Sequence, residues 1–123
     1  MEKICLDYHT ALDFLRGDPS VVEKLNYYAD REDICISSLT LTRLFFTVKK
    51  HDVVNSFANS VTILPIDHKT AVVSSKIKKN LEEQKKELPH ETLLTAAVCI
   101  ANNAFLYTKR HADFEGIKGL RKV

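Results

Sequence analysis

Residues Leu88 to Phe114 decide the fold and read LPHETLLTAAVCIANNAFLYTKRHADF. The part from about Glu91 to Ala101 is apolar on almost every side, which is typical of a helix enclosed within a protein. A short apolar strand is expected at 105–107. Two carboxylates bracket this unit, because Glu91 begins the helix and Asp113 follows the strand. The segment therefore predicts a buried helix and a strand, with an acid at either end.

The same alternation of apolar strands and amphipathic helices extends over the rest of the chain. Further strands are expected at 3–7, 34–37, 61–64 and, as an edge strand, 120–123. Helices are expected between them. Short apolar strands that alternate with helices predict a parallel sheet covered on both faces. We therefore expect a three-layer α/β/α sandwich with a central parallel sheet of four to five strands, formed by a single domain, residues 1–123.

The composition is that of an ordinary soluble globular domain. The chain has 123 residues, of which 45% are hydrophobic and 28% charged, enough for one core. Its net charge of +2 is too small to indicate nucleic-acid binding, although a polyanion remains a possible substrate if the basic residues cluster.

The cysteines and the first residues predict a cytoplasmic location. Three cysteines in apolar stretches, without zinc-site spacing, indicate buried free thiols in a reducing compartment. The first residues do not resemble a signal peptide, and no apolar run approaches the roughly 20 residues that span a bilayer.

Polar side chains follow the predicted strands at the edge where ligands bind in open parallel sheets. Asp7 closes the first strand, Ser37 and Ser38 follow the second, and Asp113 comes shortly after the fourth. Several carboxylates at one point repel one another unless a cation lies between them, and oxygen ligands suit Mg²⁺ or Mn²⁺. Such an ion activates water and neutralises charge during attack on a phosphodiester. Asp7, Glu91 and Asp113 are therefore the candidate metal ligands and catalytic residues.

Each acid also has a structural explanation, which is the more common one for a single carboxylate. Asp7 would bind the backbone of the turn that follows it. Glu91 lies in the first turn of a helix, where the helix dipole favours an anion. Asp113 would be the N-cap of a last short helix, and Thr10 is the predicted N-cap of the first helix. The functional hypothesis rests on the three acids lying together.

The chain resembles the PIN domains, and within them the small VapC-type toxin ribonucleases. The resemblance covers the chain from end to end and is carried by 6–17, 36–44, 64–67, 91–97, 108–114 and 119–120. It implies a Mg²⁺- or Mn²⁺-dependent site that cleaves RNA, a homodimer, and a small antitoxin protein as partner. Three family acids correspond to Asp7, Glu91 (where the family usually has Asp) and Asp113. Candidate substrate-binding residues are Ser38, Arg43, Thr108, Lys109 and Arg110.

Three positions depart from the family pattern. Arg43 stands where the family has a Glu on the third helix, which replaces −1 by +1 at a cation site. At about 4 Å and an effective dielectric near 20, each unit-charge interaction is worth roughly 4 kcal/mol. Arg43 would then bridge Asp7 and Asp113 in place of a metal. Tyr8 is bulky where the family has a small polar residue, and Arg110 stands where it often has Asn.

Two functions of different classes follow from these residues. In the first, the three acids hold a divalent ion and the protein is an endoribonuclease. In the second, the protein is a PIN-like domain without efficient catalysis, which binds RNA through Arg43, Lys109 and Arg110 or binds a partner protein. A third possibility, a phospho-acceptor signalling domain, uses the same sheet, but Asp7 lacks the acidic pair that such domains place after the first strand.

Overall fold

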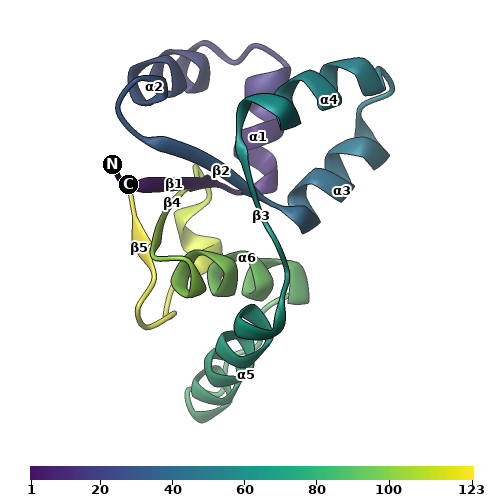
Figure 1. The fold of residues 1–123 in the computed structure, drawn as a ribbon. Coiled ribbons are helices and arrows are strands. Elements are labelled where there is room, and N and C mark those ends of the chain that lie inside the picture. The colour runs from purple at the N-terminus through teal and green to yellow at the C-terminus, as the bar shows by residue number, and fades with distance from the viewer.

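The computed structural model describes residues 1–123 and contains a five-stranded sheet between two layers of helices (Figure 1). The strands are β1 (Lys3–Leu6), β2 (Asp33–Ser37), β3 (Thr62–Leu64), β4 (Ala104–Tyr107) and β5 (Arg121–Lys122). Their order is β3-β2-β1-β4-β5, and every neighbouring pair is parallel. The predicted parallel sheet is confirmed, including its edge strand.

Four helices cover one face of the sheet and two cover the other. In Figure 1, α1 (Tyr8–Leu15), α2 (Pro19–Ala29), α3 (Ser38–Thr47) and α4 (His51–Ser60) lie above the sheet. Below it lie α5 (His68–Glu83) and α6 (His90–Ala101). A 3₁₀ helix, η1 (His111–Phe114), follows β4. The predicted three-layer sandwich is therefore confirmed, as is the enclosed helix, most of whose residues are buried.

Successive residues of each strand supply the two cores, because side chains alternate between the faces of a sheet. Ile4 and Leu6 pack against the layer of α1 to α4, whereas Cys5 packs with α5 and α6. The same alternation sends Leu106 and Tyr107 to opposite cores. Both faces of the strands are apolar for this reason.

The three cysteines are free and buried in the core beside α6, as predicted. Burial raises the pKa of the Cys35 thiol to about 12. The pKa of Cys5 is also raised, first by its hydrogen bond with Cys99 and then by burial. The Cys5 and Cys35 thiols therefore act as small apolar core groups, since reactivity requires the thiolate.

The strand order reverses beside β1. The chain runs from β1 outward to β2 and β3, and then returns to place β4 and β5 on the other side. The carboxyl ends of β1 and β4 therefore flank the switch point at which open parallel sheets bind ligands. None of the helices is long and apolar enough to cross a membrane.

The start of α1 differs from the predicted one. Asp7 is the N-cap, and its Oδ1 accepts a hydrogen bond from the Thr10 N–H at 2.9 Å. The prediction that Thr10 caps this helix is therefore wrong, because the carboxylate directly after β1 already accepts from an N–H of the first turn. The structural role expected for Asp7 is confirmed by the same contact.

Candidate functional site

A polar pocket of about 230 Å³ lies at the carboxyl edge of the sheet. It receives side chains from the end of β1, from α3, from the start of α6 and from the segment after β4. Five of the eight candidate residues line it, namely Asp7, Arg43, Glu91, Arg110 and Asp113. The other three, Ser38, Thr108 and Lys109, do not. The three acids do line one pocket, although each of them already forms a hydrogen bond with another side chain of the protein.

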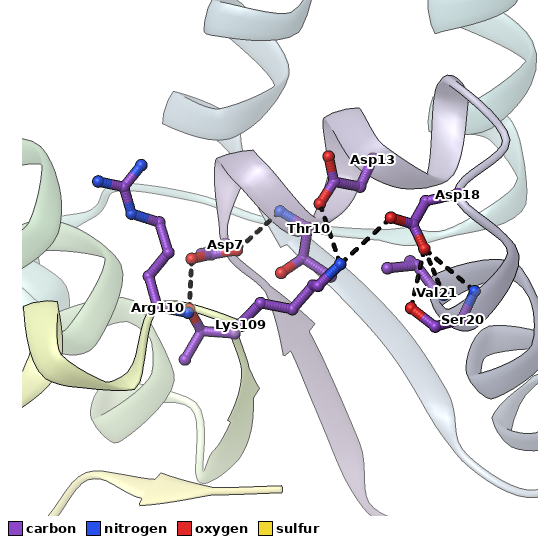
Figure 2. A network of polar contacts seen from close by, with 9 residues as sticks. Asp7, Thr10, Asp13, Asp18, Ser20, Val21, Lys109 and Arg110 are labelled. Carbon is purple, nitrogen blue, oxygen red and sulfur yellow. Dashed lines mark hydrogen bonds and ion pairs between the residues drawn. The ribbon is translucent and has the colours of Figure 1, made fainter.

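Asp7 is only 4% exposed, and both of its carboxylate oxygens are engaged. Oδ1 accepts from the Thr10 N–H (Figure 2), and Oδ2 accepts from the Thr108 hydroxyl at 2.7 Å. The Thr108 hydroxyl oxygen accepts in turn from the Arg110 N–H at 2.9 Å. Thr108, which does not line the pocket, therefore fixes the Asp7 side chain and joins the end of β1 to the segment after β4.

Arg43 reaches from α3 across the sheet edge to α6. Its Nη1 donates to Glu91 Oε1 at 2.8 Å, and both side chains are about 40% exposed, at 41% and 38%. The guanidinium carbon lies 3.8 Å from the centre of the Tyr8 ring, a cation–π contact. No ion pair joins Arg43 to Asp7 or Asp113, so the expected bridge between those two acids does not form. Arg43 does lie in the acidic pocket, but its partner is Glu91.

Arg110 pairs with the acid that follows it by three residues. Its Nε donates to Asp113 Oδ2 at 2.8 Å, and its Nη1 lies 2.9 Å from His9 Nε2. Asp113 is the third residue of η1, whose N-cap position is Arg110 and which has no side-chain cap bond. The prediction that Asp113 caps this helix is therefore wrong, because the helix begins at His111, three residues earlier than a cap at 113 requires. Glu91, by contrast, does lie in the first turn of α6.

Lys109 points away from the pocket and fastens the segment after β4 to the first two helices. Its ammonium lies 3.2 Å from Asp18 Oδ2 and 3.7 Å from Asp13 Oδ2 (Figure 2). The Ser20 hydroxyl and the Lys109 ammonium lower the pKa of Asp18 to about 2. The pKa of Lys109 is raised by the same Asp18 contact. Lys109 therefore has a positioning role within the fold.

The two serines after β2 also serve the fold. Ser37 caps α3, because its hydroxyl accepts from the Thr40 N–H at 3.0 Å. The Ser38 hydroxyl accepts from the Ile66 N–H at 3.2 Å and so holds the segment between β3 and α5. Neither serine lines the acidic pocket.

Several pocket residues were not among the candidates. Tyr8 and His9 line it as the contacts of Arg43 and Arg110, and Thr92 and Thr95 line it beside Glu91. Thr95 follows Glu91 by four residues, a spacing that places two side chains on one helix face, and its hydroxyl donates to the Glu91 carbonyl at 2.9 Å. That spacing was the available signal for Thr95, whereas the partners of Tyr8 and His9 are distant in sequence.

The donor set does not fit the divalent ion that the PIN resemblance implies. Two guanidinium groups face three carboxylates, and each carboxylate already accepts from a guanidinium, a hydroxyl or a backbone N–H. No group of three or more His, Cys, Asp or Glu side chains is placed to hold a metal ion. Each unit of positive charge about 4 Å from the Arg43 guanidinium is repelled by roughly 4 kcal/mol at an effective dielectric near 20. As arranged, the pocket offers paired charges for hydrogen bonding.

Comparison with known proteins finds likeness in structure. No protein-family model matches the sequence, and no curated protein matches it. A chain in the crystal structure of VapBC2 from Rickettsia felis, bound to a DNA fragment from its promoter, has a TM-score of 0.89 and 23% identity over 98% of this chain and 97% of that chain. A chain of DNA-bound VapBC from Salmonella typhimurium has a TM-score of 0.89 and 24% identity, over 100% and 98% of the two chains. A chain of FitAcB from Neisseria gonorrhoeae has a TM-score of 0.79 and 19% identity, over 98% and 96%.

At this level of identity the likeness establishes the fold. It extends over nearly the full length of both chains, including the carboxyl edge of the sheet. The chain therefore has the PIN-type fold of chains in VapBC toxin–antitoxin structures, as its sequence resemblance predicts.

Proposed function

We propose that this chain is the toxin-like subunit of a toxin–antitoxin pair and that it binds a small antitoxin protein. The observation that carries the proposal is an apolar cavity of about 460 Å³ at the amino edge of the sheet. Support also comes from the fold, which is shared with chains of VapBC structures and with a toxin–antitoxin complex from Klebsiella pneumoniae.

The cavity has the anatomy of a protein-binding site, with apolar side chains surrounded by polar ones. Its larger apolar side chains are Phe14, Leu25, Ile34 and Phe57, which come from α1, α2, β2 and α4. The remaining lining residues are the apolar Met1, Ala29 and Val61 and the polar Asn26, Glu32, Asp33, Asn59, Ser60 and Thr62. It shares no residue with the acidic pocket. An apolar side chain of an antitoxin segment would fill it without touching the charged residues at the opposite edge.

Asn59→Arg tests this surface because residue 59 is exposed on α4 and lines the cavity. We expect the variant to bind the proposed antitoxin partner at least about tenfold more weakly, since the long arginine side chain would occupy the space that an antitoxin side chain needs. Titration calorimetry measures the affinity. Gel filtration of the complex also measures its size and so tests for the homodimer that the PIN resemblance implies.

The matched control is Asn55→Arg, the same substitution one turn away at an exposed position outside the cavity. It should leave the affinity unchanged. Equal binding by Asn59→Arg and the unmodified chain would show that the partner does not use this cavity. A small antitoxin protein that forms no complex with the unmodified chain would overturn the proposed pairing.

Cleavage of RNA is a second candidate function, favoured by the convergence of Asp7, Glu91 and Asp113 on one pocket. For a catalytic carboxylate we expect Asp113→Asn to reduce ribonuclease activity at least about a hundredfold. Its side chain is 47% exposed, so the substitution leaves the core untouched. The assay uses labelled RNA with Mg²⁺ or Mn²⁺ and the purified chain. Residual cleavage that is equal in both proteins would identify a contaminating nuclease and remove this candidate.

A further inference from the structure

We infer that Arg43 is the resident cation of the acidic pocket and takes the place of a divalent metal ion. The inference starts from the mismatch between the implied ion and the residues present. It concerns the carboxyl edge only and does not depend on partner binding at the apolar cavity.

The Arg43 guanidinium is held by side chains from two other helices. Glu91 of α6 accepts its hydrogen bond at 2.8 Å, and the ring of Tyr8, from the first residue of α1, lies 3.8 Å beneath its central carbon. The Tyr8 hydroxyl is 2.7 Å from Thr47 Oγ1. The Thr47 hydroxyl in turn donates to the backbone carbonyl of Arg43 at 3.0 Å. Tyr8 is only 7% exposed, so the ring is a fixed platform. The guanidinium therefore has a defined position, although the Arg43 side chain is 41% exposed.

These contacts unite two of the departures from the PIN pattern. Tyr8 is bulky where a small polar residue is usual, and Arg43 is cationic where an acid is usual. In the structure the two side chains touch each other. Each substitution has a physical reason in the presence of the other, because an aromatic face attracts a guanidinium. They form one unit that places a positive charge against Glu91.

The remaining acids are also satisfied from within the chain. Arg110 pairs with Asp113, while Asp7 accepts from the neutral donors Thr10 and Thr108. The repulsion that would otherwise call for a shared cation is relieved separately at each carboxylate. The pocket is therefore complete without a metal ion, and an added ion would first have to displace Arg43.

Arg43→Glu tests the inference because it removes the guanidinium and adds a carboxylate beside Glu91. We expect the unmodified chain to bind Mn²⁺ no more tightly than millimolar, and Arg43→Glu to bind it at least about tenfold more tightly. Mn²⁺ should raise the melting temperature of Arg43→Glu and leave that of the unmodified chain unchanged. Titration calorimetry with Mn²⁺ alone and thermal unfolding provide the two measurements.

Arg16→Glu makes the same charge change at an exposed position outside the pocket and should leave Mn²⁺ binding unchanged. Arg43→Gln removes the charge and keeps most of the side chain, so its Mn²⁺ affinity should increase less than that of Arg43→Glu. This variant replaces Arg43→Glu in the test if Arg43→Glu does not fold. Submillimolar Mn²⁺ binding by the unmodified chain, abolished by Asp113→Asn, would overturn the inference. So would equal Mn²⁺ affinity in all Arg43 and Arg16 variants. Binding of the partner protein is measured separately with Asn59→Arg, so the two proposals fail independently.

Discussion

Replacement of Asp7 by alanine is expected to lower the free energy of unfolding by about 3 kcal/mol. Loss of a helix N-cap costs about 1 kcal/mol, and here the Oδ1 bond to the Thr10 N–H would be lost. The Thr108 hydroxyl would also lose its acceptor, and a buried unsatisfied polar group costs about 1–3 kcal/mol. Urea unfolding followed by circular dichroism measures the change.

Asp67→Ala is the matched control for Asp7. Asp67 is also an N-cap aspartate, and its Oδ1 accepts from the N–H and the hydroxyl of Thr70 at the start of α5. Asp67 itself is exposed, and without it the Thr70 hydroxyl keeps the Pro65 carbonyl as an acceptor at 3.4 Å, so we expect a clearly smaller loss of stability. Equal losses in the two variants would show that the buried Thr108 bond contributes nothing to the Asp7 site.

The stability role of Asp7 also affects how a ribonuclease assay is interpreted. An Asp7→Ala variant that unfolds loses any activity for reasons unrelated to catalysis. Asp7→Asn keeps an acceptor for the Thr10 N–H, and its amide N–H can donate to the Thr108 hydroxyl oxygen. Asn therefore changes the charge at this position with less damage to the cap, which makes it the informative substitution there.

The sheet, its layers and the enclosed helix were predictable because they depend on local periodicity. Apolar runs bounded by polar residues placed every strand to within about two residues, and the apolar surface of α6 showed that it must be covered. The convergence of Asp7 and Asp113 followed from strand order in parallel sheets. These inferences need only short windows of sequence and general rules of topology.

The partners of the site residues were not predictable in the same way. Arg43 and Glu91 are 48 residues apart, Lys109 and Asp18 are 91 apart, and Thr108 and Asp7 are 101 apart. Such pairs depend on the exact positions of helices that different parts of the chain supply. The charge of Arg43 was visible in the sequence, but its choice of Glu91 over Asp7 depends on how α3 crosses the sheet edge. Local rules predicted Thr10 as the N-cap of α1 and Asp7 as a turn residue, and only the geometry after β1 shows that Asp7 is the cap.

Leu106→Ala is expected to lower the free energy of unfolding by about 3–4 kcal/mol, the largest effect of a single apolar truncation near the site. Leu106 is fully buried on β4, between β1 and β5, and packs into the core beneath α5 and α6. Truncation removes apolar contact and leaves a cavity that a central strand, paired on both sides, closes only in part.

Leu106 also lies two residues before Thr108, which holds Asp7, so the effect reaches the acidic pocket. Local opening of β4 would release the segment that positions Arg110 and Asp113 before the rest of the fold is lost. Hydrogen exchange of the Leu106→Ala variant should then show faster exchange at the Arg110 N–H than at the helices of the other layer. Ile66→Ala, an exposed position outside both cores, should cost less than about 1 kcal/mol. A Leu106→Ala loss as small as that of Ile66→Ala would mean that β4 does not hold the carboxyl edge in place.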